Sequence, residues 1–492
     1  MVRQVLIEAV LVGVSGGVLG VLLARWGVAI LVALAPTELP RSGEIRVDVA
    51  VLLFSFAASA LTGILFGAIP AFASASVDVR EALQGSSRGT TVGGQRTRGV
   101  LVSAEVALAV VLLIVMTMLA KSFAHVQAVA PGFDSTRVLS ARLTLPAKRF
   151  NTREAIVMFQ HALGERLSSL PTVTKTGAIS LLPLSGSLAR VPFTVEGRPL
   201  ERERVPVAQF RTVSSGYFEA AGIPLKRGRT FSERDTDKTR PVAVVNEELA
   251  SQWLGGLEPI GARLLVDDNN GGPRPVEIIG VVGNVHQIAL DDGPTWDLYL
   301  TYPQIHPDGV GLAAANMFWI VRTTGDPMSV ATNLAKEVHA SDPEVVASQI
   351  RPLDQYLSDA VAPRRFSLSL MAAFALAALA LAITGIYAVV LYSVSQRARE
   401  IAIRVALGAS RSSIVRLVMG HGLRFVVIGV VVGIAMAVGV MRLLSTMLFD
   451  VAATDAMTYS QVAAVVAVVS AVACAIPAAR VGRFVVGVLN AE

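Results

Sequence analysis

One short motif in the sequence combines residue types that could support nucleophilic catalysis. Residues 13–17 read Gly-Val-Ser-Gly-Gly, which satisfies the G-x-S-x-G pattern of serine hydrolases and the G-x-S-G pattern of intramembrane serine proteases. Such a serine needs a histidine within hydrogen-bond reach. His421 is the one histidine near a long apolar run, and we expect it close to the cytoplasmic edge, whereas Ser15 should lie deeper. Catalysis is therefore the weaker interpretation.

Helix packing explains the same residues more simply. Glycines recur four positions apart in three apolar runs, and such faces let membrane helices approach closely. The pairs that we expect to pack are Gly16 with Gly20, Gly63 with Gly67, and Gly429 with Gly433. The position equivalent to Ser15 in the last of these runs is Ile428, which further disfavours a catalytic serine.

Other chemical signatures are absent from the sequence. It contains no G-x-x-x-x-G-K-[ST] phosphate loop and no H-E-x-x-H metal motif, so we expect no ATP hydrolysis by that route and no bound metal or other cofactor. The pI near 9.7 does not indicate nucleic-acid binding, because the basic residues are dispersed rather than clustered with stacking aromatics. Anionic lipid headgroups are the better partner for the basic loops.

A basic, amphipathic segment at residues 396–411 is the most informative feature of the sequence. Glu400 and Arg404 form a favourable i,i+4 pair, and Ile401 begins an apolar stripe beside them. Gly408 should end this helix, and Ser410 or Ser412 should cap the next one. Basic residues alone could mark the cytoplasmic side of a membrane. The presence of both charge signs and a defined end favours a docking helix for a soluble partner.

Composition places this segment in a membrane protein. The mean hydropathy is +0.58, with 53% hydrophobic and 16% charged residues, outside the usual range of soluble domains. Six runs reach the roughly 20 residues needed to span a bilayer. They are Val5–Leu34, Val49–Phe72, Val100–Leu119, Phe366–Val394, Leu417–Leu444 and Tyr459–Ala479.

The flanking charges predict the orientation of these spans. Lys and Arg accumulate in cytoplasmic loops, and the basic loops between the six runs all fall on one side if both termini are cytoplasmic. Residues 121–365 then form one insertion on the outer side, too long for a loop and long enough for a core of its own. Its strand-like runs, such as Val276–Val282 and Pro241–Val245, alternate with helical runs, such as Glu154–Leu170 and Val330–Ala340, which predicts an α+β domain.

The two ends of the chain resemble each other. Gly16 and Gly20 match Gly429 and Gly433 at a constant offset, and residues 68–71 repeat as Ala-Ile-Pro-Ala at 475–478. Both pairs of spans look like the closing half of one kind of module. We therefore expect the chain to be a fragment of a longer duplicated protein, or one that has lost half a module and needs a complement.

Several of these residues carry a resemblance to a known family. Residues 399–409, Arg-Glu-Ile-Ala-Ile-Arg-Val-Ala-Leu-Gly-Ala, resemble the hallmark of the FtsX-like permease domain of MacB-like ABC transporters. The outer insertion resembles the MacB-like periplasmic core domain. The segments that carry that likeness are 214–218 (Ser-Ser-Gly-Tyr-Phe), 222–225 (Gly-Ile-Pro-Leu), 228–229 (Gly-Arg) and 281–285 (Val-Val-Gly-Asn-Val).

The resemblance implies a permease driven through a coupling helix by a separate cytoplasmic ATPase, which would bind the ATP and Mg. The residues that it implies for ATPase coupling are Arg399, Glu400, Ile401, Arg404, Leu407 and Gly408. It further implies a homodimer or a complementing permease half, and a partner in the periplasm. The implied activity is export, or extraction of a substrate, at the bacterial inner membrane. The alternative is a non-transporting scaffold that transmits motion to regulate an envelope enzyme.

The predicted architecture is a multi-pass α-helical membrane protein of about six transmembrane helices with one large extracytoplasmic α+β domain. Its expected divisions are 1–80, the closing two helices of a first, truncated FtsX-like module; 81–98, a cytoplasmic linker; 99–120, the opening helix of a second module; 121–365, the periplasmic core domain; and 366–492, the permease domain with three helices and the coupling helix at 396–411.

Overall fold

The computed structural model describes most of the chain. The described residues are 2–33, 48–61, 91–198, 205–267, 272–397, 400, 401, 403, 404, 407 and 409–489. They divide into a helical unit, Met1–His125 with Ala362–Glu492, and an outer unit, Val126–Val361. Each unit is described by itself below.

Five helices of the described residues are long and apolar enough to cross a membrane. They are α1 (Val2–Ala33), α4 (Thr91–Ala128), α10 (Leu353–Gln396), α12 (Arg411–Leu443) and α13 (Ala456–Leu489). Of the expected second span, the described part contains the shorter apolar helix Val49–Leu61. Length and composition thus account for five of the six expected spans.

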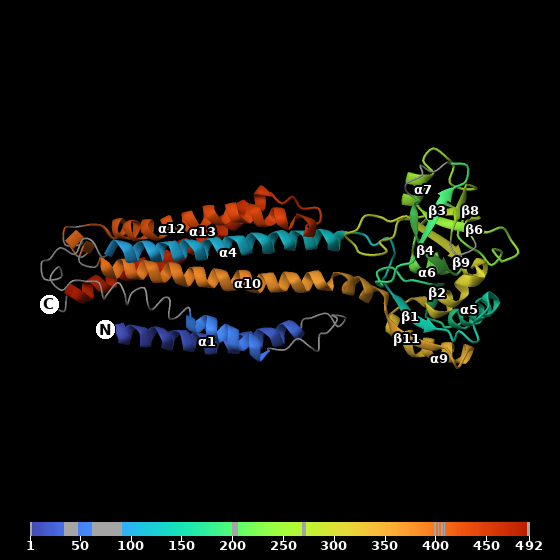
Figure 1. The fold of residues 1–492 in the computed structure, drawn as a ribbon, viewed down its shortest axis with the longest axis horizontal. Helices are drawn as coiled ribbons and strands as arrows, with labels where there is room; N and C mark the ends of the chain where they lie inside the picture. The colour runs from blue at the N-terminus through green and yellow to red at the C-terminus, as the bar shows by residue number, and fades with distance from the viewer. Residues whose placement is uncertain are drawn as a thin grey trace. The chain divides into compact units, whose positions relative to one another are not determined.

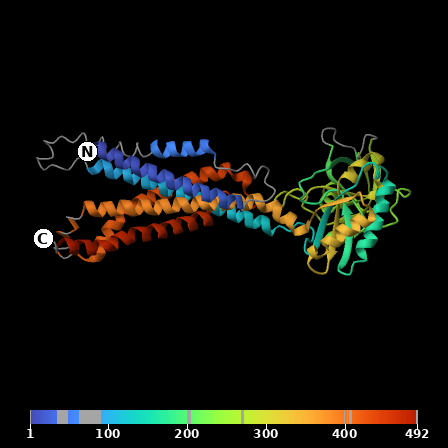
Figure 2. The same ribbon diagram turned by 90° about the horizontal axis from the view of Figure 1, so that it is seen from below.

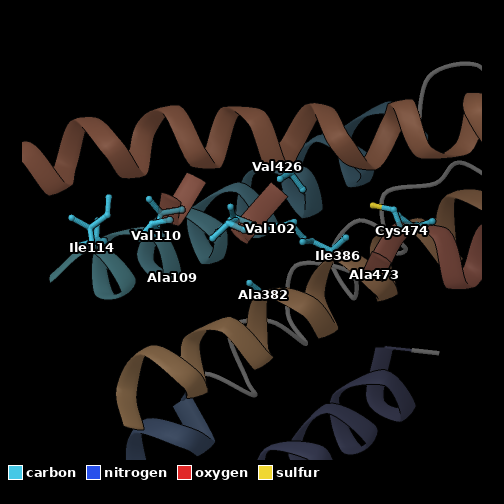
Figure 3. Packing of buried hydrophobic residues seen from close by; sticks show 14 of the residues in the cluster. Val102, Ala109, Val110, Ile114, Ala382, Ile386, Val426, Ala473 and Cys474 are labelled. Carbon is cyan, nitrogen blue, oxygen red and sulfur yellow. The ribbon is translucent and has the colours of Figure 1, made fainter. Parts of the chain in front are cut away.

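Helices α4, α10, α12 and α13 run side by side and share one apolar core (Figure 1 and Figure 2). Figure 3 shows Val110 of α4, Ala382 of α10, Val426 of α12 and Cys474 of α13 within this core. All four are nearly inaccessible to solvent. Helices that are apolar on all sides suit such a bundle, since one side contacts other helices and the other side contacts lipid.

Two of these helices extend beyond their expected spans. Helix α4 begins at Thr91, inside the segment expected to be a linker, and α10 begins at Leu353, inside the segment expected to belong to the outer domain. Helix α10 continues through Pro363. A proline removes its own backbone hydrogen bond but need not end a helix, and polar residues next to an apolar run can continue it. Hydrophobicity located the spans without locating the helix ends.

The outer unit is built on one mixed sheet of 11 strands. The strands are β1 (Val138–Thr144), β2 (Val173–Ile179), β3 (Arg190–Val195), β4 (Val207–Val213), β5 (Leu225–Gly228), β6 (Val242–Asn246), β7 (Arg263–Val266), β8 (Arg274–Val282), β9 (Asp297–Thr301), β10 (Met317–Thr323) and β11 (Val346–Pro352). Its α-helices are α5 (Arg153–Ser168), α6 (Tyr217–Ala221), α7 (Glu247–Trp253), α8 (Val310–Ala315) and α9 (Ala331–Ser341). Strands β6 and β8 and helices α5 and α9 confirm the four elements expected from the sequence.

The strand order divides the sheet into two parts. Strands β11, β1, β10 and β2 follow one another in antiparallel pairs, and β2 continues to β4. From β4 the order runs β3, β7, β8, β6 and β9, and β9 pairs again with β4, so these six strands form a closed ring. The ring has its own apolar cluster, which includes Phe193, Val245 and Leu298.

Helices α5 and α9 pack on the open part of the sheet. Leu163 of α5 and Leu334 of α9 share a buried cluster with Ala178 of β2 and Trp319 of β10. Gly177, one residue before Ala178, lies on the opposite face, where α6 begins. A Cβ at Gly177 would lie 2.5 Å from the Cα of Tyr217, so only glycine allows this close approach. The approach places the loop 214–216 beside β2.

Candidate functional site

The segment between α10 and α12 is the candidate docking site. Its described residues 400, 401, 403 and 404 are helical, and backbone hydrogen bonds run from Ile401 N to the Arg397 carbonyl (2.9 Å) and from Leu407 N to the Ile403 carbonyl (3.0 Å). Ser410 caps α12, because its side chain accepts a hydrogen bond from Ser413 N. The expected short helix, followed by a serine cap, is therefore present. Arg399 and Gly408 lie outside the described residues.

The expected ion pair in this segment is formed. An Arg404 guanidinium nitrogen lies 2.8 Å from a Glu400 carboxylate oxygen, and the two side chains are 48% and 46% exposed. A pair this exposed contributes less than about 1 kcal/mol to stability. Its consequence is that both charges stay in a fixed arrangement at a surface where a partner can meet them.

Ile401, which was expected at the ATPase contact, is buried rather than exposed at that surface. It is 1% exposed and belongs to the core cluster of the helical bundle. A helix turns by about 100° per residue, so residue 403 points almost opposite to residue 401. Ile401 therefore anchors the segment to the bundle.

The opposite side of the segment carries two exposed apolar residues. Ile403 is 56% and Leu407 is 82% exposed, and their i,i+4 spacing puts them on one face. Leu407 was expected at the contact surface, whereas Ile403 was not among the predicted residues. Ile403 could have been identified from its position two residues after Ile401, because a helix places residues two apart on nearly opposite sides. Two exposed apolar side chains beside an ion pair are typical of a partner-binding surface.

Two of the six predicted packing glycines form a seam between α12 and α4. A Cβ at Gly429 would lie 2.7 Å from the Ser103 carbonyl oxygen, and a Cβ at Gly433 would lie 2.8 Å from that of Ala107. The hydroxyl of Ser103 also donates a hydrogen bond of 3.0 Å to the Phe425 carbonyl. The absence of side chains at the two glycines thus brings the backbones of α12 and α4 together.

The corresponding glycines of α1 behave differently. Among the described residues, nothing lies within 4 Å of a Cβ position at Gly16 or Gly20, and the packing expected for these two glycines stays a prediction. A Cβ at Gly17 would instead lie 3.4 Å from the ring of Phe56 and 3.5 Å from the Cβ of Ser59. Gly17 follows Gly16 directly, so it points to a different side of α1. Gly63 and Gly67 lie outside the described residues.

At the other end of the bundle, α4 is connected to the loop between α12 and α13 by polar contacts. Lys121 Nζ lies 2.6 Å from an Asp455 carboxylate oxygen, and Ser122 Oγ accepts a hydrogen bond of 2.9 Å from Phe449 N. His125 Nδ1 lies 3.0 Å from the Asp450 carbonyl. We call these three contacts the outer clamp. These contacts were not predicted from the sequence.

The clamp shifts the ionisation of Asp455. The ammonium of Lys121 and the hydroxyl of Thr458 donate hydrogen bonds to its carboxylate and lower its pKa from 3.8 to about 2. Asp455 also caps α13, because it accepts a hydrogen bond from Met457 N. The carboxylate is therefore charged, and the clamp intact, at any ordinary pH.

A carboxyl group within α4 was not predicted. Glu105 places one carboxylate oxygen where it is buried without a hydrogen-bond partner, and that oxygen lies 2.1 Å from the position that a Cβ at Gly385 would take. The absence of a side chain at Gly385 leaves room for it. Acidic residues are rare in membrane helices and tend to be functional.

The outer unit contains a buried polar cluster. Arg211, on β4, is fully buried, and none of its three guanidinium nitrogens has a hydrogen-bond partner among the described residues. Nearby, Asp297 accepts a hydrogen bond of 2.9 Å from the Gln287 amide. Burial raises the pKa of Asp297 from 3.8 to about 6, and the positive charge of Arg211 opposes part of that rise. A buried carboxyl and guanidinium side by side make this cluster sensitive to pH.

Two family profiles match the chain. The MacB-like periplasmic core domain matches residues 106–337, and the FtsX-like permease C-terminal domain matches residues 372–485. The first contains the outer unit's sheet up to β10, and the second contains α12 and the docking segment. These are the two domains expected from the sequence.

Curated relatives share the same region. The chain is 27% identical over 231 residues to the probable syringafactin export ATP-binding/permease protein SyfD of Pseudomonas syringae, covering 47% of this chain and 34% of that protein. It is 24% identical over 283 residues to the macrolide export ATP-binding/permease protein MacB of Neisseria meningitidis, covering 56% and 42%. The match thus spans about a third to two fifths of these relatives.

A comparison with solved structures also gives a match. The crystal structure of the periplasmic region of MacB from Actinobacillus actinomycetemcomitans shares 16% identity, covers 46% of this chain and 93% of that one, and has a TM-score of 0.31. The chain thus combines a MacB-like periplasmic core domain and an FtsX-like permease C-terminal domain with helices long and apolar enough to cross a membrane, and in this it resembles the MacB-like, FtsX-like ABC transporter permeases.

Proposed function

We propose that this chain is the permease subunit of an ABC-type transporter, and that a separate cytoplasmic ATPase drives it through the docking segment. Both termini and the docking segment would face the cytoplasm, and the outer domain would face the periplasm. The work would be export, or extraction of a substrate at the inner membrane, as the names of the relatives suggest for those proteins. ATP and Mg would bind the partner.

The observation that carries the proposal is the exposed face of the docking segment. Ile403 and Leu407 present apolar side chains next to the Glu400–Arg404 pair, while Ile401 joins the segment to the bundle core. A force applied to the exposed face would therefore be transmitted to α10, α12 and α4. The glycine seam and the outer clamp would carry that force along α4, which leads toward the outer domain.

The test measures ATPase activity in the purified complex of this chain and its ATPase. One variant removes the ion pair of the docking segment, and a control variant removes an ion pair of similar exposure elsewhere. Glu400→Ala with Arg404→Ala should abolish stimulation of the ATPase by this chain, while membrane insertion stays normal. The control is Lys226→Ala with Glu247→Ala, an outer-domain pair in which each side chain is 45% exposed. Unchanged stimulation in the docking variant, or equal loss in the control, would contradict the proposal.

The outer clamp supports a second candidate function, a scaffold that transmits motion without transport. Such a scaffold would use the same contacts from Lys121 to Asp455 to regulate an envelope enzyme. Deletion of the chain distinguishes the two. Loss of export of a compound supports the permease, and an envelope or division defect without any export defect supports the scaffold.

A further inference from the structure

The outer domain contains a cleft of about 320 Å³ far along the chain from the docking segment. It is lined by residues of α5, by Ser214–Gly216, by Ser232 and Glu233, and by Trp319 of β10. Its size suits a small organic molecule. The cleft lies entirely within the outer unit.

Helix α5 presents a polar face to this cleft. Gln160, His161, Glu165 and Ser168 line it, at spacings that put them on one side of the helix. The other side buries apolar residues such as Leu163 and so fixes the orientation of α5. Gly164 lies between these polar positions and leaves the wall open.

Glu233, which also lines the cleft, has its carboxylate held by two neighbouring side chains. Ser215 Oγ donates a hydrogen bond of 2.6 Å to one oxygen of Glu233, and His161 Nε2 lies 2.8 Å from the other. The second contact joins α5, which carries His161, to the loop that carries Glu233. Glu233 is thus oriented by two neighbours, as expected of a binding group.

Gln160 has hydrogen-bonding capacity that the protein does not use. It is only 8% exposed, it lines the cleft, and its amide nitrogen makes one contact, 3.8 Å long, to the sulfur of Met317. A thioether is a weak acceptor. Among the described residues, its carbonyl oxygen has no partner. This oxygen can therefore accept a hydrogen bond from a ligand in the cleft.

Three of the lining groups are hydrogen-bond acceptors, whereas the indole N–H of Trp319 is a buried donor without a partner among the described residues. Glu165, Glu233 and the Gln160 carbonyl are acceptors, and the described residues that line the cleft include no Lys or Arg. Such a site disfavours phosphate, sulfate and carboxylate ligands and favours a donor with positive charge. We propose that this cleft binds a small primary amine, whose ammonium group donates hydrogen bonds to Glu165, Glu233 and Gln160. This inference goes beyond the proposed function, because binding requires neither the ATPase nor transport.

The test is calorimetry on the full chain in lipid nanodiscs. The probes are tyramine and alanyl-phenylalaninamide, each compared with its neutral N-acetyl derivative. At least one amine should bind saturably, and acetylation should weaken binding roughly tenfold or more, the loss expected when a charge-assisted hydrogen bond is removed. Failure of both amines to saturate, or equal binding of amine and acetyl derivative, would overturn the proposal.

Two variants locate the binding. Glu165→Gln with Glu233→Gln should weaken binding as much as acetylation does, and Glu258→Gln, which alters a 68% exposed carboxylate outside the cleft, should bind as the natural sequence does. Equal loss in both variants would contradict the assignment to this cleft. If the double variant fails to fold, the acetylation comparison on the natural sequence still decides.

Discussion

The ammonium of Lys121, near the outer end of α4, lies 2.6 Å from the carboxylate of Asp455, which caps α13. Side chains 334 positions apart in the sequence thus join two helices of the bundle. The clamp and the glycine seam connect α4 to the α12–α13 hairpin at two separate levels. Under the proposed function, motion that starts in the docking segment would reach α4 through these contacts.

Replacement of Asp455 by Asn should lower the melting temperature of the purified chain. The variant loses the charge that binds Lys121 and weakens the cap of α13. Because the folded pKa of Asp455 is about 2, below its ordinary 3.8, its stabilising effect is complete above pH 3.8 and is lost as the pH falls through 2. Thermal unfolding at pH 7 and pH 3 measures this. A melting temperature equal to that of the natural sequence at pH 7 would show that the clamp is unimportant.

Replacement of Gly433 by Ala should destabilise the bundle by about 1–3 kcal/mol, the usual cost of overpacking. The added Cβ would lie 2.8 Å from the Ala107 carbonyl oxygen, and backbone cannot easily move aside. Gly439→Ala is the matched control in the same helix, because nothing lies within 4 Å of its Cβ position. The control should be neutral or stabilising by up to about 1 kcal/mol. Similar stability of the two variants in detergent would show that the close approach of α12 to α4 at Gly433 does not stabilise the bundle.

The seam shows what sequence patterns can and cannot establish. The spacing of Gly429 and Gly433 correctly indicated a face for close approach, because helical periodicity alone puts them together. The same spacing at Gly16 and Gly20 corresponds to no contact in the described part of the chain, since spacing cannot say whether another helix covers that face. The identity of the partner, α4, follows only from the three-dimensional packing.

Asp297 should make the stability of the outer domain depend on pH. Its folded pKa, about 6, is above its ordinary 3.8, so the unfolded chain loses this proton first. The free energy of unfolding should therefore fall as the pH rises from 4 to 6, by roughly 3 kcal/mol for a difference of about two pKa units between the folded and unfolded chain. Asp297→Asn should remove this slope, as measured by tryptophan fluorescence during thermal unfolding. An unchanged slope in the variant would assign the effect to other groups.

The two isoleucines of the docking segment should respond in opposite ways. Ile401→Ala should destabilise the bundle by about 2–5 kcal/mol, because it removes a buried side chain from the core. Ile403→Asp should leave the melting temperature almost unchanged and reduce recovery of the ATPase in affinity purification. Loss of the ATPase from Ile401→Ala alone, with Ile403→Asp unaffected, would reverse the assignment of the two faces.

The sequence predicted the domains better than the individual contacts. Hydrophobic runs located the spans, and residues 399–409 located the docking segment, because both depend on local composition. The burial of Ile401 was not predicted, because an amphipathic stripe in a short segment between two spans can face either the bundle or the cytosol. Glu105 was missed because one acidic residue hardly changes the hydropathy of α4, and Gly385, which makes room for it, is 280 positions away.

The most direct test of the central claim is crosslinking from the exposed face of the docking segment. Leu407→Cys, 82% exposed, would carry a photoreactive maleimide, while the natural Cys474 is fully buried and should stay unlabelled. In native membranes, illumination should join this position to an ATPase that contains a phosphate loop, identified by mass spectrometry. The same label on Ser445→Cys, between α12 and α13, should give no ATPase adduct. Absence of an ATPase adduct from position 407, or an equal yield from position 445, would contradict a permease driven through this segment.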